Sequence, residues 1–191
     1  MEHKEREMEY GDDCYRRFLS GDENAFAEMV ETYREGLIFF LCRYVNSVET
    51  AEDLAEDVFV EVLLHPKRYR FQCTLKTWLF AIGRHKAADS LRRNSRLQLC
   101  DMEAAAELAD LRSLEEDVLR SEENKTLNRA LGEISPDYRN AIHLVYFEGL
   151  SCEEAARVLG KTRKQTENLL YRGKLSLSKI LLKEGFDYEK R

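Results

Sequence analysis

Only two prolines and nine glycines interrupt this chain of 191 residues, and that scarcity restricts its possible folds more than any other feature. Leu, Ala, Glu, Lys and Arg dominate the composition, and these residues have high helix propensity. Hydrophobic residues make up 43% of the chain, which is ordinary for a folded protein and argues against disorder throughout. The sequence therefore predicts an all-α protein, long enough for one domain or two small ones.

Several function classes are disfavoured by what the sequence lacks. No apolar run approaches the ~20 residues of a membrane-spanning helix, and the N-terminus lacks the layout of a signal peptide. The cysteines are scattered and odd in number, without a C-x-x-C pair, which favours a reducing compartment over a disulfide framework or a zinc site. No histidine lies in a metal-binding motif, and no glycine-rich phosphate loop occurs. We expect a soluble, cytoplasmic protein that is not an enzyme, with no direct membrane insertion and no catalytic residues, metal or cofactor.

Charge divides the chain into four blocks. Residues 1–64 carry a net charge of −11 and residues 65–97 one of +8, while residues 98–127 return to −6 and residues 128–191 carry +3. This alternation indicates two basic surfaces separated by an acidic connector. Basic surfaces are the electrostatic footprint of nucleic-acid binding, although a solvated helix face is an alternative reading of each run.

The first module is predicted over residues 14–97 and begins with two helices. Apolar residues recur at helical spacing from Ala25 to Leu41, which predicts a buried helix. A second helix is expected to start near Thr50, where Thr50 and Asp53 have the spacing of a capping box, and to end before Pro66.

A basic and aromatic loop at residues 67–74 leads into a third helix, expected over residues 75–96. Its predicted buried stripe consists of Leu75, Trp78, Leu79 and Ile82. The same stripe later meets Lys86, Asp89 and Arg93, so the C-terminal half of this helix should protrude into solvent or onto a polyanion. Asp89 can pair with a neighbouring arginine at helical spacing.

Residues 98–121 are predicted to form a flexible acidic linker, and residues 122–186 the second module. Within that module Ser135 has the place of a helix N-cap followed by proline, and Gly149 the place of a helix end.

The stretch from Ser151 to Lys174 has the pattern of a helix-turn-helix. Ser151 and Glu154 form a capping box, Gly160 opens a tight turn, and an amphipathic helix starts near Arg163. In this motif the second helix enters the DNA major groove, where Asn168 could pair with adenine and Glu167 with cytosine. An ordinary helical hairpin is the alternative.

Both modules together resemble bacterial sigma factors, in particular the compact extracytoplasmic-function (ECF) group of the sigma-70 family. The resemblance is carried by Gly21-Asp22-x-x-Ala25-Phe26, Ala51-Glu-Asp53-Leu54-Ala-Glu-Asp57-Val58-Phe59, Thr77-Trp78-Leu79-Phe80-Ala81-Ile82-Gly83-Arg84, Leu150-Ser151-x-Glu-Glu-Ala-Ala156 and Gln165-Thr-Glu-Asn-Leu-Leu-Tyr-Arg172. The order and spacing of these segments, with an acidic linker between them, are specific to the family.

The resemblance implies a sigma region 2 over residues 14–97 and a sigma region 4 over residues 122–186. The implied partners are core RNA polymerase, promoter DNA and an anti-sigma factor. Polymerase binding would fall to Asp53, Leu54, Glu56, Asp57 and Phe59. Binding and melting of the −10 element would fall to Arg68, Tyr69, Arg70, Phe71, Arg84, His85, Lys86, Arg92 and Arg93. Binding of the −35 element would fall to Arg163, Lys164, Glu167, Asn168, Tyr171, Arg172 and Lys174.

These roles carry expectations about exposure. Tyr69 and Phe71 are expected on an exposed loop, where an aromatic ring can stack on an unpaired base, whereas Trp78 is expected in the core. A conventional helix-turn-helix regulator would explain the second module alone, and its sign would be tight duplex binding without polymerase. A protein that serves only as an interaction adaptor would neither bind duplex DNA tightly nor act as a sigma factor.

Overall fold

The computed structural model of the protein describes residues 2–45, 47–98 and 122–183. These ranges contain helices and their connections and no β-strand, so the expected all-α fold is confirmed for them. The predicted linker lies outside the described residues apart from Gln98, as does the end of the second module after Lys183.

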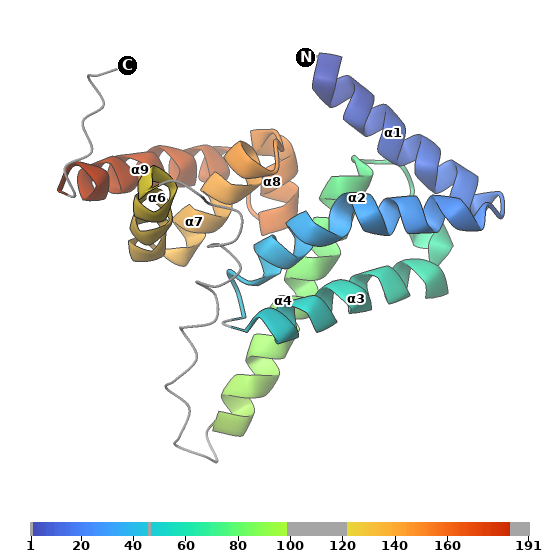
Figure 1. Ribbon diagram of the computed structural model, residues 1–191, viewed down its shortest axis with the longest axis horizontal. Coiled ribbons are helices and arrows are strands. Elements are labelled where there is room, and N and C mark those ends of the chain that lie inside the picture. The colour runs from blue at the N-terminus through green and yellow to red at the C-terminus, as the bar shows by residue number, and fades with distance from the viewer. Residues whose placement is uncertain (1, 46, 99–121, 184–191) are drawn as a thin grey trace.

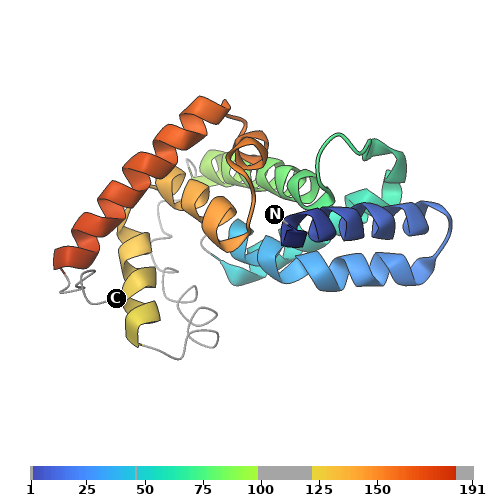
Figure 2. The same cartoon turned by 90° about the horizontal axis from the view of Figure 1, so that it is seen from above.

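The helices form two modules (Figures 1 and 2). The N-terminal module consists of α1 (Glu2–Leu19), α2 (Glu23–Leu41), α3 (Val48–Leu64), the 3₁₀ turn η1 (Pro66–Arg68) and α4 (Leu75–Gln98). The C-terminal module consists of α6 (Glu122–Glu133), α7 (Pro136–Ile142), the π-helical turn η2 (His143–Phe147), α8 (Cys152–Leu159) and α9 (Arg163–Lys183). Helix α4 contacts α1, α2 and α3 on one side and α8 on the other.

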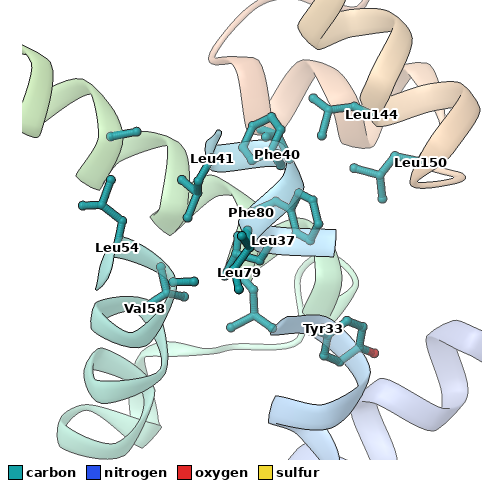
Figure 3. Packing of buried hydrophobic residues seen from close by; sticks show 14 of the residues in the cluster. Tyr33, Leu37, Phe40, Leu41, Leu54, Val58, Leu79, Phe80, Leu144 and Leu150 are labelled. Carbon is teal, nitrogen blue, oxygen red and sulfur yellow. The ribbon is translucent and has the colours of Figure 1, made fainter. Parts of the chain in front are cut away.

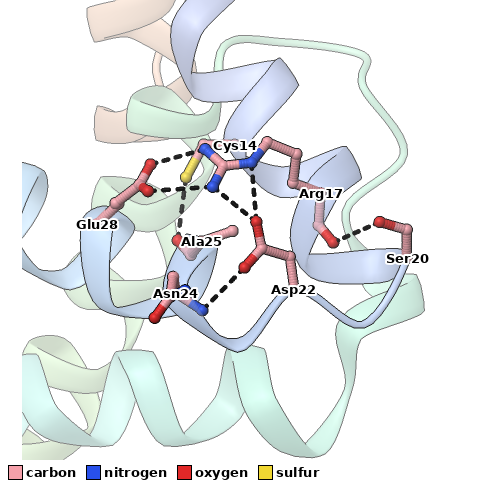
Figure 4. A network of polar contacts seen from close by, with 7 residues as sticks. All are labelled: Cys14, Arg17, Ser20, Asp22, Asn24, Ala25 and Glu28. Carbon is pink, nitrogen blue, oxygen red and sulfur yellow. Dashed lines mark hydrogen bonds and ion pairs between the residues drawn. The ribbon is translucent and has the colours of Figure 1, made fainter.

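Helix α1 was not predicted, and a polar network fixes it against α2 (Figure 4). The guanidinium of Arg17 binds the carboxylates of Asp22 and Glu28, with ion-pair distances of 2.6 and 2.8 Å. The same Asp22 caps α2 by accepting a hydrogen bond from the Asn24 amide. The Cys14 thiol donates to the carbonyl of Ala25 at 3.0 Å, so the start of α2 is tied to α1.

The predicted cap of α3 was wrong. The helix begins at Val48, and Ser47 is its N-cap, whose side chain accepts a hydrogen bond from the Thr50 amide at 3.2 Å. Thr50 therefore lies inside the first turn and cannot open a capping box with Asp53. Pro66 follows the end of α3 as expected and starts η1.

The core of the N-terminal module is built on α2, α3 and α4. Leu37, Leu41, Val58 and Leu79 are fully buried there (Figure 3). On α4, Leu75 and Leu79 are buried as predicted, whereas Trp78 and Ile82 are only partly buried. The C-terminal half of α4 extends beyond the other helices, as expected (Figure 1).

The C-terminal module has the predicted helix-turn-helix geometry. Ser151 and Glu154 form the capping box at the start of α8. Gly160 ends α8 with a φ of 62°, a left-handed conformation that side-chain-bearing residues rarely adopt. Gly173 of α9 lies so close to α7 that an added Cβ would stand 3.1 Å from Ile142 and Tyr138. Ser135 takes the N-cap position of α7 before Pro136, but its side chain makes no capping bond.

The hydrophobic cores of the two modules are continuous. Leu144 and Leu150 of the C-terminal module lie beside Phe40 and Phe80 of the N-terminal module (Figure 3), and all four are buried. The modules therefore pack directly against each other, which the expectation of two linked domains did not include. We call this arrangement the closed contact.

The reassigned cap of α3 gives a stability prediction. Ser47→Ala should lower the free energy of unfolding by about 1 kcal/mol, because the Thr50 amide loses its acceptor. Thr50→Ala is the matched control, and it should cost clearly less. Urea denaturation followed by circular dichroism measures both, and a larger loss for Thr50→Ala would restore the original capping-box assignment.

Candidate nucleic-acid interface

The exposed face of α9 carries the residues predicted for major-groove binding. Lys164, Glu167, Asn168 and Tyr171 are all exposed, and so are Arg163, Arg172 and Lys174. Thr166 and Leu170 point into the module on the opposite face. The structure therefore brings the seven residues together on one solvent-exposed helix.

Local hydrogen bonds order the start of this helix. The Thr162 amide donates to Gln165 Oε1 at 2.8 Å, and the Gln165 amide donates to Thr162 Oγ1 at 3.2 Å. This is a second capping box, which the Thr-x-x-Gln pattern could have indicated. Arg163 Nε donates to Glu167 Oε1 at 2.9 Å, so this carboxylate already has a partner before any base is bound.

The loop before α4 is more ordered than expected, and the expected exposure of Tyr69 was wrong. Its side chain is only 3% exposed, and its hydroxyl oxygen lies 2.6 Å from both Asp12 Oδ1 and the Cys73 carbonyl. Burial and the adjacent Asp12 carboxylate raise the pKa of Tyr69. Its ring packs against Tyr15 and Trp78, at centroid distances of 4.8 and 5.1 Å. A sequence reading could not foresee this, because Asp12 and Tyr15 come from a distant part of the chain.

Phe71 remains a partly exposed aromatic side chain of this loop. Its backbone has a φ of 57°, the only positive value among the described non-glycine residues. The ring lies 4.7 Å from that of Tyr69, and the Arg16 guanidinium stands 4.9 Å from its centroid. A left-handed phenylalanine is held only where its surroundings determine it, so the loop presents this ring in a fixed orientation.

Some basic residues of the predicted −10 face are exposed, and some form ion pairs with acidic side chains. Arg70, His85, Arg92 and Arg93 are exposed. Asp89 pairs with Arg92, whose hydrogen bond lowers the pKa of the carboxyl, as the helical spacing had suggested.

Two cations of that face are bound to α3. Arg68 pairs with Glu61, and Lys86 Nζ lies 3.4 Å from Glu61 and 3.8 Å from Asp57. The basic α4 surface and the acidic α3 surface are therefore neighbours.

Helix α3 presents an acidic edge with apolar neighbours. Asp53, Glu56 and Asp57 are exposed as predicted. Leu54 and Phe59 are buried at 6% and 5% exposure, so they pack α3 into the core and cannot present a binding surface. The two apolar members of the predicted polymerase-binding set are therefore buried, whereas its three acidic members are exposed.

Sequence reasoning missed the apolar side chains that α3 does expose. They are Val60, Leu63 and Leu64, with exposures of 48%, 48% and 68%. They lie in the segment 58–64, which is apolar except for Glu61, so its buried and exposed apolar faces cannot be told apart without knowing the neighbouring helices.

A buried polar cluster in the closed contact was also missed. Glu148, at the end of η2, is bound by Lys76 of α4, whose Nζ lies 3.0 Å from Oε2 and donates to the Glu148 carbonyl at 2.8 Å. His143 Nε2 lies 3.1 Å from Oε1 on the other side. Lys76 and Glu148 are 72 residues apart in the chain, and no local sequence pattern connects them.

Burial governs the titration of this cluster. Burial lowers the pKa of His143, and the nearby positive charges of Arg43 and Lys76 lower it further. The carboxylate of Glu148 raises this pKa but does not outweigh them. For Glu148, burial raises the pKa, but His143 and Lys76 together outweigh it, so the pKa lies below its usual value. The cluster therefore holds a neutral imidazole and an ionised carboxylate at neutral pH.

Other kinds of site find no support in the described part of the chain. There, no group of three or more His, Cys, Asp or Glu side chains is arranged to hold a metal ion. None of the described helices is long and apolar enough to cross a membrane.

Comparisons with known proteins agree with this geometry. Residues 29–97 match the family description "Sigma-70 region 2", and residues 125–177 match "Sigma-70, region 4". The RNA polymerase sigma factor YlaC of Bacillus subtilis is 26% identical over 162 residues, which is 84% of this chain and 94% of YlaC. The ECF RNA polymerase sigma factor SigW of the same organism is 25% identical over 175 residues, covering 87% of this chain and 94% of SigW.

Solved structures show the same fold. CnrH, solved in complex with the cytosolic domain of CnrY, aligns with a TM-score of 0.63 at 25% identity, covering 90% of this chain and 97% of CnrH. The sigma factor RpoE of Bartonella quintana aligns with a TM-score of 0.64 at 22% identity, covering 82% of this chain and 96% of RpoE. The chain therefore belongs to the sigma-70 family, in its ECF group, and is an RNA polymerase sigma factor.

The buried histidine gives a pH prediction. The unfolded chain takes up a proton on His143 near pH 6.5, whereas the folded chain resists it, so the free energy of unfolding should fall as the pH drops from 7.5 to 5.5. His143→Gln keeps a donor near Glu148 without titrating, so it should flatten this decline. The matched control His85→Gln removes an exposed histidine and should leave the decline as in the parent. Equal pH slopes for the parent and His143→Gln would contradict the assignment.

Proposed function

We propose that this sigma factor acts by recruitment and not by catalysis, in the cytoplasm, with its three exposed surfaces divided among three binding tasks. Region 2 would comprise residues 14–97, the linker residues 98–121 and region 4 residues 122–186. The observation that carries the proposal is that one chain exposes three surfaces of different character, namely the acidic edge of α3, the basic side of α4 and the recognition face of α9. A conventional duplex-binding regulator would need only the last of these.

Polymerase docking is assigned to Asp53, Glu56 and Asp57, together with the exposed apolar residues of α3. An acidic rim speeds encounter with a basic partner, while central apolar contacts supply most of the binding energy. Leu54 and Phe59 would support this surface from beneath by packing α3 into the core.

Binding of the −10 element is assigned to the ordered loop and to the protruding half of α4. Arg70, His85, Arg92 and Arg93 would contact the backbone, and Phe71 is the aromatic ring available to an unstacked base. Tyr69 is reassigned as a positioning residue, because its hydroxyl and ring hold the loop in place. Arg68, Arg84 and Lys86 stay within the proposed face. The ion pairs of Arg68 and Lys86 with α3 would have to exchange for DNA contacts.

Binding of the −35 element is assigned to α9, with Asn168 and Glu167 toward base edges and the cationic residues toward phosphates. The family also points to regulation by an anti-sigma factor. RpoE of Bartonella quintana was solved with the anti-sigma factor NepR, and we propose a partner of that kind for this chain.

Transcription by purified bacterial core RNA polymerase tests the function directly. With this chain present, genomic DNA of the source organism should yield new discrete start sites that share two upstream elements. Absence of new starts, despite active core and folded protein, would contradict the proposal.

The docking surface has its own test. The double variant Asp53→Asn with Glu56→Gln should slow association with core polymerase about 3- to 10-fold at low salt, since it removes two exposed charges without changing shape. Glu31→Gln, at an exposed position of α2, is the matched control. Stopped-flow fluorescence of the labelled chain measures the association rate. If the double variant slows association no more than the Glu31→Gln control does, the acidic edge of α3 is not part of the polymerase interface.

Two substitutions on α9 distinguish base contacts, which depend on the DNA sequence, from phosphate contacts, which depend on charge. Lys164→Gln should weaken promoter binding by the holoenzyme on all −35 sequences alike and reduce the slope of log K against log salt by about 1. Asn168→Ala should instead relax the preference at one base pair and leave the salt slope unchanged. The contradictory outcome is a uniform loss for Asn168→Ala, which would make it a backbone contact.

A further inference from the structure

Helix α1 supports the loop that carries Phe71. The hydroxyl of Tyr15, on α1, donates to the Pro66 carbonyl at 2.8 Å, where the loop begins. The Asp12 carboxylate, also on α1, lies 2.6 Å from the Tyr69 hydroxyl in the middle of the loop. The match to sigma-70 region 2 begins at residue 29, so α1 lies outside the matched segment. The contacts of α1 with the loop are therefore a feature of this chain that the family match does not cover.

Close packing fixes α1 in this position. A Cβ added at Gly11 would stand 2.6 Å from the Tyr33 hydroxyl of α2 and 3.4 Å from Leu75 Cβ at the start of α4. Tyr15, one turn after Gly11, is fully buried. A helix packed this closely cannot slide along its neighbours. The next residue, Arg16, therefore leaves α1 at a fixed point beside the loop.

Phe71 is held with a face of its ring toward Arg16. Its φ of 57° is a conformation that phenylalanine rarely adopts, so the surrounding contacts must impose it. The rings of Tyr69 and Tyr15 pack against it, at 4.7 and 6.1 Å between centroids. The Arg16 guanidinium lies over the ring, 4.9 Å from its centroid. Phe71 is partly exposed and Arg16 is exposed, so solvent reaches this pair of planar groups.

An aromatic ring paired with a guanidinium suits an unpaired nucleic-acid base. Bases stack on aromatic rings and on guanidinium planes, and every base has a face that can do so. The guanidinium now stands 4.9 Å from the ring centroid, and a base between them would require about 7 Å, because stacked layers lie about 3.5 Å apart. The long, exposed side chain of Arg16 can make this small movement by rotation, while the Phe71 ring stays in place.

Of the two neighbouring arginines of α1, Arg16 is the one placed for DNA. Arg17 binds Asp22 and Glu28, so it is committed to holding α1 against α2. Arg70 of the loop is exposed and supplies a second positive charge for the phosphates of the same strand.

We propose that Arg16 of α1 and Phe71 form a slot for one unpaired base of the −10 element, with the base stacked between the guanidinium and the ring. The slot rests on the proposed binding of the −10 element by the loop and α4, and it adds α1 to that surface. Asp12 and Tyr69 are positioning residues that hold the loop beneath the slot. A base inside a duplex has both faces covered by its neighbours, so the slot selects melted DNA over duplex DNA.

Three variants separate base stacking from charge. Arg16→Ala removes both the planar group and its charge, whereas Arg16→Lys keeps the charge and loses the plane. Phe71→Leu keeps an apolar side chain and loses the aromatic face. Arg34→Ala is the matched control, because it removes one positive charge from α2, where the guanidinium pairs with Glu52.

The readout is the affinity of the holoenzyme for single-stranded DNA, measured by fluorescence anisotropy. The probes are the two single strands of the −10 element of a promoter mapped with the holoenzyme. The tighter-binding strand is then tested with one base at a time replaced by an abasic site. Arg16→Ala and Arg16→Lys should weaken binding of the intact strand about 3- to 10-fold, and Phe71→Leu about 5-fold or more.

The abasic strands identify the base. At one position, loss of the base should weaken binding by the parent, and on that strand Arg16→Lys and Phe71→Leu should cost nothing further. The loss for Arg16→Ala should shrink there to that of Arg34→Ala, because only charge is left to lose. Circular dichroism should show the helix content of the parent in every variant.

The outcomes separate the slot from the underlying function. An equal loss for Arg16→Ala on the intact strand and on every abasic strand would make Arg16 a phosphate contact and overturn the slot. Full rescue by Arg16→Lys, or parental or tighter binding by Arg16→Ala, would also overturn it. Failure of the parent holoenzyme to bind either strand of the −10 element would instead overturn the proposed function.

Discussion

The carboxylate of Glu148 and the apolar side chains around it determine how the two modules lie against each other. A charge at this depth is tolerated because Lys76 lies 3.0 Å away and His143 3.1 Å away, from two different modules. Removing Lys76 would leave this buried carboxylate without a compensating charge, which is costly in any protein interior. Helix α8 adds contacts of its own, because Arg157 donates to the Gln72 carbonyl at 2.7 Å and so ties α8 to the loop before α4.

Around that contact, the exposed surfaces are each held by local structure. The capping box at Thr162 and Gln165 orders the first turn of α9, where base edges would be contacted. The aromatic cluster on Tyr69 fixes the loop that carries Phe71. Binding surfaces that are ordered in advance lose less conformational entropy when DNA arrives.

Local patterns predicted most of the helices, because caps, glycine ends and helical periodicity act over a few residues. Ser151, Gly160 and the exposed face of α9 are where the sequence placed them. The predictions were wrong where contacts between distant segments of the chain determine whether a residue is buried. Tyr69 lies on the predicted loop, but its side chain is buried and not exposed, because Asp12 and Tyr15 enclose it. Helix α1 was missed in a densely charged stretch where few apolar residues mark a buried face.

The apolar residues of α3 also show that local sequence patterns do not distinguish buried from exposed side chains. Leu54 and Phe59 are buried, whereas Val60, Leu63 and Leu64 face solvent, and only the neighbouring helices distinguish them. The Glu148 cluster joins Lys76 to Glu148, which are 72 residues apart in the chain, so no periodicity could indicate it. The family resemblance implied which segments bind polymerase and DNA, but it did not indicate that the modules cover one another.

The distance between the two modules, before and after promoter binding, tests the central claim most directly. Spectroscopic labels at positions 31 and 179, exposed on α2 and α9, would report it in the free chain and in the complex with polymerase and promoter. We predict one short distance in the free chain and a clearly longer one in the promoter complex. The same short distance in both states would contradict the assignment of the −10 and −35 elements to two different modules.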